Sequence, residues 1–138
     1  LPNQDGKTVR LSALRGKTVL VYFYPKDDTP GCTKEACSLR DGAADFAGKD
    51  AVILGISPDS AASHQKFRAK YQLPFDLLSD PDHAVLEAWG AWGEKNLYGK
   101  KSLGVLRSSF VIGPDGLVKK IFRKVDTAAH AAQVLPFL

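Results

Sequence analysis

Two cysteines, Cys32 and Cys37, are the residues whose type and spacing point most clearly to chemistry. Cys32 follows a loop at residues 25–31 that contains two prolines and a glycine, and it opens a stretch with apolar residues at helical spacing. We therefore expect it in the first turn of a helix, where unpaired backbone N–H groups and the helix dipole favour a thiolate over a thiol. This position predicts an exposed, redox-active cysteine; the alternative is an inert cysteine packed as a small apolar residue.

The five-residue spacing of the cysteines limits what they can do together. On an intact helix, residues at this spacing have Cα atoms about 9 Å apart, whereas a disulfide needs less than about 7 Å. The pair can join only if the first helical turns unwind, and we expect such a bond to be strained and easily reduced. Position 35 is Glu35, so the Cys-x-x-Cys pattern of thioredoxin-type dithiols is absent.

A metal centre is not expected from the histidines. Zinc needs four ligands, and His64, His83 and His130 lack ligand spacing. Each histidine is expected on a helix surface or at a helix cap. The sequence contains no flavin or nucleotide motif, so we also expect a reaction without a cofactor.

The composition predicts one domain over residues 1–138, since chains of roughly 100–200 residues usually form one. With 44% apolar residues and a net charge of +4, such a chain can bury a core without cross-links, so the cysteines are not expected to be structural. No apolar run reaches the roughly 18–20 residues of a membrane helix, and the opening lacks a secretory pattern. We therefore expect a cytoplasmic protein without a membrane partner. Because the chain has no methionine, we expect Leu1 to start a trimmed protein.

Basic residues are concentrated in one region, residues 95–124, which hold eight lysines and arginines against one aspartate. A nucleic-acid interface would interleave such charges with exposed aromatic residues or place them on a helix. Here they fall in a glycine-rich loop and an expected strand, where lysines discourage pairing between sheet edges. Nucleic-acid binding is therefore not expected.

The elements that position the cysteines follow from the apolar pattern. Residues 18–23 and 51–57 are near-continuous apolar runs, typical of strands buried on both faces, and residues 32–46 between them have helical spacing. Two buried strands separated by a helix predict a parallel, right-handed crossover. The loop before Cys32 then lies at the carboxyl end of a parallel strand, where open α/β sheets bind their ligands.

The rest of the chain predicts a mixed sheet. The expected elements are a helix from Asp59 or Ser60 to Tyr71, a strand at 75–79, a helix from Asp80 to near Gly90, a loop at 90–104, strands at 105–112 and 117–123 joined by a turn at 113–116, and a terminal helix capped by Asp126 or Thr127. This ordering is that of a thioredoxin-like fold, an α/β fold with a mixed central sheet and helices on both faces.

Arg107 is the candidate partner for Cys32. It falls within the apolar run 105–112, and an arginine in such a run is seldom buried without a partner. Glu35 is the obvious mate for a structural ion pair. An arginine near Cys32 would also stabilise the thiolate and hold an oxygen-rich substrate, and the two roles do not exclude each other.

The segment around the cysteines resembles the active-site segment of peroxiredoxins, in their bacterioferritin comigratory protein or Q-type branch. It carries the Pro-x-x-x-Thr/Ser-x-x-Cys motif as Pro25, Thr29 and Cys32, with the second cysteine of that branch at Cys37. Further segments also resemble this branch: its loop at residues 90–95 and 98–100, and its arginine strand at residues 107–112. The resemblance covers the chain from about Leu1 onward and implies that N-terminal family residues ahead of Leu1 are missing.

The resemblance implies a thioredoxin-dependent peroxidase that reduces hydrogen peroxide and organic hydroperoxides. Cys32 would attack the peroxide as a thiolate and become a sulfenic acid. Thr29 would hydrogen-bond the thiolate and the substrate, Pro25 would shield the sulfur from water, and Arg107 would polarise the O–O bond. Cys37 would resolve the sulfenic acid into an intramolecular disulfide, which thioredoxin or a similar reductant would open.

The resemblance also implies a monomer, because resolution can occur within one chain. Two alternatives stay open: a disulfide-exchange protein that uses the same cysteines without peroxide, and a binding module switched by their oxidation. The aromatic residues Trp89, Trp92 and Tyr98 are expected either to form apolar walls of a substrate site or to belong to the core.

Overall fold

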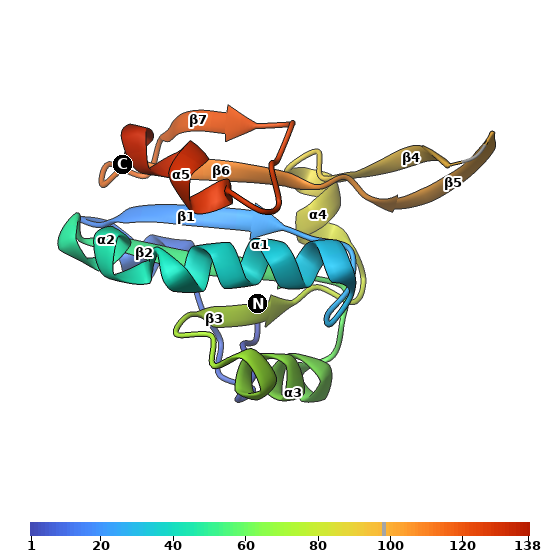
Figure 1. Ribbon diagram of the computed structural model, residues 1–138, viewed down its shortest axis with the longest axis horizontal. Helices are drawn as coiled ribbons and strands as arrows, with labels where there is room; N and C mark the ends of the chain where they lie inside the picture. The colour runs from blue at the N-terminus through green and yellow to red at the C-terminus, as the bar shows by residue number, and fades with distance from the viewer. Residues whose placement is uncertain (98) are drawn as a thin grey trace.

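A five-stranded mixed sheet forms the centre of the molecule in the computed structural model, which describes residues 1–97 and 99–138. Across the sheet the strands are β3 (Asp76–Ser79), β2 (Ala51–Ser57), β1 (Thr18–Phe23), β6 (Ser108–Ile112) and β7 (Val118–Phe122) (Figure 1). β2 pairs in parallel with β1 and β3, whereas β6 pairs antiparallel with β1 and β7. The parallel crossover and the mixed sheet that the sequence predicts are therefore confirmed.

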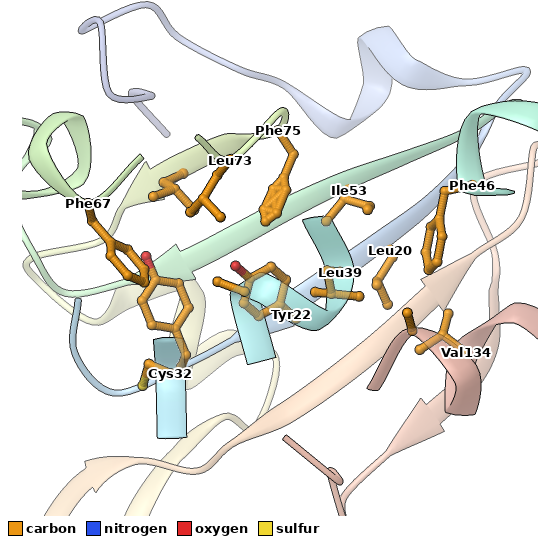
Figure 2. Close-up of a cluster of buried hydrophobic side chains, with 14 of the residues drawn as sticks. Leu20, Tyr22, Cys32, Leu39, Phe46, Ile53, Phe67, Leu73, Phe75 and Val134 are labelled. Atoms are coloured by element: carbon orange, nitrogen blue, oxygen red, sulfur yellow. The ribbon is translucent and has the colours of Figure 1, made fainter. Parts of the chain in front are cut away.

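Helices cover both faces of this sheet, as predicted. One face holds α1 (Pro30–Asp41), α2 (Ala43–Gly48), α3 (Ala61–Tyr71), α5 (His130–Val134) and the 3₁₀ turn η2 (Leu135–Phe137); the other holds α4 (Ala84–Ala88) and the 3₁₀ turn η1 (Leu11–Leu14). Alternation within β1 divides the core, because successive side chains of a strand point to opposite faces. Leu20 and Tyr22 pack under α1 (Figure 2), while Val21 and Phe23 pack on the side of α4.

The single helix predicted over residues 32–46 is two helices, α1 and α2, which meet at Gly42. A Cβ at this position would lie 2.8 Å from Cβ of Ala131, so only glycine allows the close approach of α5. Glycine is also a weak helix former. The packing of α5, which is distant in the sequence, therefore requires at position 42 a residue at which a helix tends to break.

Two predicted helix starts are wrong, because an aspartate stabilises a turn at each place. The carboxylate of Asp80 accepts a hydrogen bond from the backbone N–H of Leu86 at 2.8 Å, and His83 has a left-handed φ of 61°, so α4 begins only after His83. The carboxylate of Asp126 accepts from the N–H of Ala128 at 3.1 Å, and α5 follows later. Aspartate side chains commonly compete with the helix in this way.

The region predicted as a loop, residues 90–104, instead holds the antiparallel hairpin of β4 (Trp92–Leu97) and β5 (Lys100–Val105), which projects from the body of the molecule (Figure 1). Much of β5 is exposed, so the hairpin lacks the apolar alternation of a half-buried strand. The predicted strand at 105–112 is also wrong in its first part. β5 ends at Val105 and β6 begins at Ser108, which places Arg107 in the short connection between them.

Two aromatic residues near this hairpin, Trp89 and Trp92, are partly buried and pack against the core on the α4 side of the sheet. Trp89 packs edge-on against Phe23 and Phe110, and Trp92 stacks on His83 with ring centroids 3.7 Å apart. Tyr98 lies outside the described residues. None of the helices in the described part of the chain has both the length and the hydrophobicity needed to cross a membrane.

Candidate active site

Cys32 lies in the first turn of α1, directly after the loop that leaves β1. Pro30 begins this helix, where its missing N–H costs nothing. The prediction of an exposed thiol is wrong, because Cys32 is 1% exposed and belongs to the apolar cluster between α1 and the sheet (Figure 2). Tyr24 and Ala36 are members of the same cluster. Cys32 and Cys37 are both free thiols, and Cys37 is partly exposed.

Arg107 connects Cys32 to Glu35 through two nitrogens of one guanidinium group. Its Nη2 donates to Sγ of Cys32 at 3.3 Å, and its Nη1 donates to Oε1 of Glu35 at 2.6 Å. The ion pair with Glu35 that the sequence predicts is therefore present. Burial lowers the pKa of Arg107, but the charges of Glu35 and Cys32 raise it by more. A permanent positive charge thus lies beside the sulfur, where it stabilises a thiolate.

Gly31 gives Arg107 the room to approach Cys32. A Cβ at position 31 would lie 3.3 Å from Nη2 of Arg107, which is tighter than ordinary van der Waals contact. Gly31 is not among the residues with positive φ, so the backbone conformation does not require glycine here. Glycine is required here because the guanidinium of Arg107 occupies the space that a Cβ would need.

We expect Gly31→Ala to slow the oxidation of Cys32 by hydrogen peroxide about tenfold. The guanidinium would have to shift by a few tenths of an ångström, and a misplacement of about 1 Å can cost about a hundredfold in rate. Stopped-flow fluorescence of the reduced protein measures the rate. The matched control is Gly48→Ala, because a Cβ at that α2 position has nothing within 4 Å. A rate for Gly31→Ala equal to that of the control would contradict this role of Gly31.

Pro25 and Thr29 lie in the loop between β1 and α1, as predicted. The hydroxyl of Thr29 donates to the carbonyl of Lys26 at 2.8 Å, so its oxygen is left to accept further hydrogen bonds. Pro25 is partly buried. The structure thus places the loop residues next to Cys32 along the chain, while side-chain hydrogen bonds join Cys32, Arg107 and Glu35.

A buried carboxylate, Asp27, fastens this loop to α3. It accepts hydrogen bonds from the hydroxyls of Tyr24 at 2.6 Å and Ser63 at 2.8 Å, and it lies 2.7 Å from Nδ1 of His64. The other nitrogen of His64, Nε2, lies 3.0 Å from the carbonyl of Leu78, which can only accept, so Nε2 donates. Each polar atom of the imidazole is therefore satisfied within the protein.

A second contact with α3 holds the neighbouring residue, Asp28. Its backbone is left-handed, with a φ of 58°, and its carboxylate accepts from Nζ of Lys70 at 2.8 Å and from the hydroxyl of Tyr71 at 2.9 Å. These contacts lower the pKa of Asp28. A non-glycine residue in this conformation is strained and needs such support, so α3 fixes the shape of the loop that precedes the cysteine.

Sequence reasoning missed His64 and His130, which it placed on helix surfaces or at caps. Both are fully buried, whereas His83 does take a cap position, at the start of α4. His64 could have been found, because it lies three residues before the buried Phe67 and therefore on the same face of α3. His130 gives no such signal, because its helix is short.

Three side chains in this region, Asp27, Asp59 and His64, offer metal-ligating atoms within 4.8 Å of one another. These atoms already have partners inside the protein. Asp59 accepts from the backbone N–H of Asp27 at 2.8 Å and from the hydroxyl of Ser57 at 2.7 Å. The group is therefore explained by its hydrogen bonds, which brace the loop.

Cys37 lies on the same continuous helix as Cys32. Glu35 lies between the two cysteines, is fully buried, and faces away from water toward α5. Burial raises its pKa to about 7, although the charge of Arg107 and its hydrogen bond lower it. A disulfide between the cysteines requires α1 to unwind around Glu35.

Comparison with known proteins places this geometry in a family. Residues 1–121 match the AhpC/TSA family. The chain is 48% identical to peroxiredoxin Bcp of Bacillus subtilis over 138 residues, which is all of this chain and 88% of that protein. It is 46% identical to peroxiredoxin Bcp of Escherichia coli, again over all of this chain and 88% of that protein.

The solved structures agree with the sequences. A structure of the bacterioferritin comigratory protein of Xanthomonas campestris, described as a trapped intermediate and ligand complex in alkyl peroxide reduction, has a TM-score of 0.93 and 43% identity. The match covers 99% of this chain and 87% of that chain. The chain therefore belongs to the AhpC/TSA family, in the bacterioferritin comigratory protein or Q-type branch of the peroxiredoxins.

Proposed function

We propose that Cys32 is the peroxidatic cysteine of this peroxiredoxin and that Cys37 resolves its oxidised form. As a member of the family, the protein is a thiol-dependent peroxidase with a thioredoxin-like fold. The observation that carries the assignment is the 3.3 Å contact between Nη2 of Arg107 and Sγ of Cys32. A charged donor at this distance stabilises the attacking thiolate and the charge that develops on the peroxide.

The reaction has two chemical steps. The thiolate of Cys32 attacks one peroxide oxygen, the O–O bond breaks, and the leaving oxygen takes a proton to become water or an alcohol, which leaves a sulfenic acid. The thiol of Cys37 then attacks the sulfenic sulfur, water leaves, and a disulfide forms. Two electrons and two protons from an external dithiol restore both thiols.

Residues of the loop complete the site in this proposal. Thr29 hydrogen-bonds the peroxide through its hydroxyl oxygen, which is oriented by the bond to Lys26. Pro25 shields the sulfur, and Glu35 orients Arg107 through their 2.6 Å hydrogen bond. Hydrogen peroxide and alkyl hydroperoxides are the substrates, and thioredoxin or a similar dithiol protein is the reductant. We further propose a monomer that acts in the cytoplasm, where thiols are kept reduced.

Treatment of the reduced protein with one equivalent of hydrogen peroxide tests the assignment. The expected product has lost two hydrogens in an intact mass spectrum, and peptide mapping finds Cys32 joined to Cys37. The oxidation should be much faster than that of a free thiol. Oxidation at the free-thiol rate would instead support a disulfide-exchange protein.

The variant Cys37→Ser distinguishes the role of Cys37 from that of Cys32. Its first oxidation should keep the wild-type rate, because the hydrogen bond from Arg107 to the sulfur of Cys32 is unchanged. The product should gain one oxygen and react with a sulfenic-acid trap. Rapid recycling by thioredoxin should be lost. If recycling continues at the wild-type rate, a thiol from outside the chain resolves the sulfenic acid and the proposed role of Cys37 is refuted.

A further inference from the structure

Glu35 occupies a place in α1 that the proposed reaction must disturb. It lies between Cys32 and Cys37, and its side chain is fully buried in the reduced, helical form. A residue inside a helical segment cannot keep its side-chain position when that segment unwinds to join the two cysteines. Oxidation therefore removes Glu35 from its buried site.

The two carboxyl oxygens of Glu35 have different surroundings. Oε1 accepts the 2.6 Å hydrogen bond from Arg107. Oε2 has no hydrogen-bond partner within the described residues, and it lies 3.7 Å from Nε2 of His130. A charged oxygen that is buried without a donor is costly. A proton on Oε2 removes the charge, which is the larger part of this cost, and still leaves Oε1 to accept from Arg107.

His130 is placed to face a protonated Glu35. Its Nδ1 lies 2.9 Å from the side-chain oxygen of Gln133, which also accepts from the backbone N–H of Asp126, so Nδ1 carries a proton and donates. Burial lowers the pKa of His130. In the neutral ring, Nε2 is then an acceptor, and its lone pair takes the hydrogen bond of the Ser109 hydroxyl at 2.7 Å. Glu35 therefore faces an uncharged ring that offers Oε2 no proton.

The other groups that face Glu35 come from β1, from α1 and from the connection between β5 and β6. Tyr22 of β1 has a pKa raised first by burial and then by the charge of Glu35, so it stays neutral. Arg107 supplies a positive charge, and the sulfur of Cys32 accepts a hydrogen bond from it. Burial outweighs the opposing effect of Arg107 and raises the pKa of Glu35 from its ordinary value of 4.5 to about 7.

We propose that Glu35 carries a proton that is linked to the redox state of the cysteines: the buried acid holds the proton in the helical dithiol form and releases it to water when α1 unwinds and the disulfide forms. Reduction of the S–S bond then takes two electrons and two protons for the thiols, and a third proton for Glu35. This inference rests on the proposed roles of Cys32 and Cys37, and it adds a proton to their cycle.

The sign of the linkage follows from the two states of Glu35. Below the ordinary pKa of a glutamate both forms hold the proton, and above about pH 7 neither does. Between these limits the dithiol form binds one proton more, so raising the pH favours the disulfide. In this window the extra proton changes the redox equilibrium constant tenfold per pH unit, which is 29.6 mV for a two-electron couple.

Carbon-13 NMR of the glutamate carboxyls tests the inference on the unaltered site. The chain has three glutamates, Glu35, Glu87 and Glu94, so protein labelled at this carbon gives three signals. The variants Glu87→Gln and Glu94→Gln assign the other two without touching the site. The signal of Glu35 should titrate near pH 7 in the dithiol form and near its ordinary value in the disulfide form. One common midpoint in both forms would overturn the inference.

A redox titration in dithiothreitol buffers provides the second measurement. Glu35→Gln keeps an oxygen to accept from Arg107 but cannot titrate. Between about pH 5 and 7 its potential should fall with pH less steeply than that of the wild type, by one proton per two electrons. Glu87→Gln, an exposed glutamate of α4, should keep the wild-type slope. Equal slopes for all three proteins would overturn the linkage.

The two experiments also separate this inference from the proposed function. If peroxide produces the disulfide but Glu35 titrates alike in both forms, the roles of the cysteines stand and the linkage is refuted. If the reduced protein shows the raised midpoint but peroxide produces no disulfide, the role of Cys37 is refuted and the linkage falls with it.

Discussion

Replacing Cys32 with serine is expected to reduce peroxide consumption to the rate measured without protein. The thiolate is the nucleophile toward the O–O bond, and a serine hydroxyl stays protonated at neutral pH even beside Arg107. Consumption of hydrogen peroxide in the presence of thioredoxin, thioredoxin reductase and NADPH measures the effect. The fold should persist, because the hydroxyl is smaller than the thiol and can accept the hydrogen bond that Nη2 now donates to Sγ.

The matched control for this loss is Cys37→Ser, which changes the same side chain five residues away. It should retain the first oxidation, measured in a single turnover. Cys32→Ser therefore fails at the attack on peroxide, whereas Cys37→Ser fails at the formation of the disulfide. Turnover in Cys32→Ser above the protein-free rate would contradict the assignment of the peroxidatic thiol.

Replacing Arg107 with methionine is expected to slow the oxidation of Cys32 by about a hundredfold to a thousandfold, the usual cost of removing one donor from a charge-stabilising site. The variant loses the positive charge 3.3 Å from the sulfur. Stopped-flow mixing with peroxide measures the second-order rate constant, and the final yield of disulfide should be unchanged, since Cys37 is intact.

The variant should still fold, because Glu35 can become neutral. Arg107 lowers the pKa of Glu35, so its removal raises that pKa further and leaves a protonated, uncharged acid in the core. Arg123→Met is the control for loss of an arginine, since Arg123 donates to the carbonyl of Gly90 and lies over the ring of Phe110. If Arg107→Met is oxidised at the same rate as the control, Arg107 does not stabilise the charge that develops in the oxidation of Cys32.

The sequence predicts the parts of the site that depend on local pattern. The buried strands β1 and β2 are continuous apolar runs, and Pro30 and Gly31 begin the helix that carries Cys32. The pairing of Arg107 with Glu35 follows from a general rule, that an arginine in an apolar run needs a partner. The strands and the helix start are marked within a few neighbouring residues, whereas the ion pair joins residues that are 72 positions apart.

The features that sequence reasoning missed depend on contacts between distant segments. The burial of His130 results from the packing of α5 near Glu35. Cys32 is buried because the sheet and α1 close over it, although its place in the first turn of a helix predicts exposure. The hairpin of β4 and β5 is paired along its length but largely exposed, so no apolar periodicity marks it in the sequence.

The hold of α3 on the loop before Cys32 has a consequence for the time course of the cycle. Asp27 and Asp28 are fastened to α3 rather than to α1, so the loop stays in place while the first turns of α1 open and close. The turns of α1 then reform next to a loop whose conformation has not changed. The opening of α1 is the slower half of this motion, because it removes the buried Glu35 from its site, and local unfolding of this kind takes microseconds to seconds. We therefore expect the fixed loop to speed the closing of α1 after each reduction more than its opening.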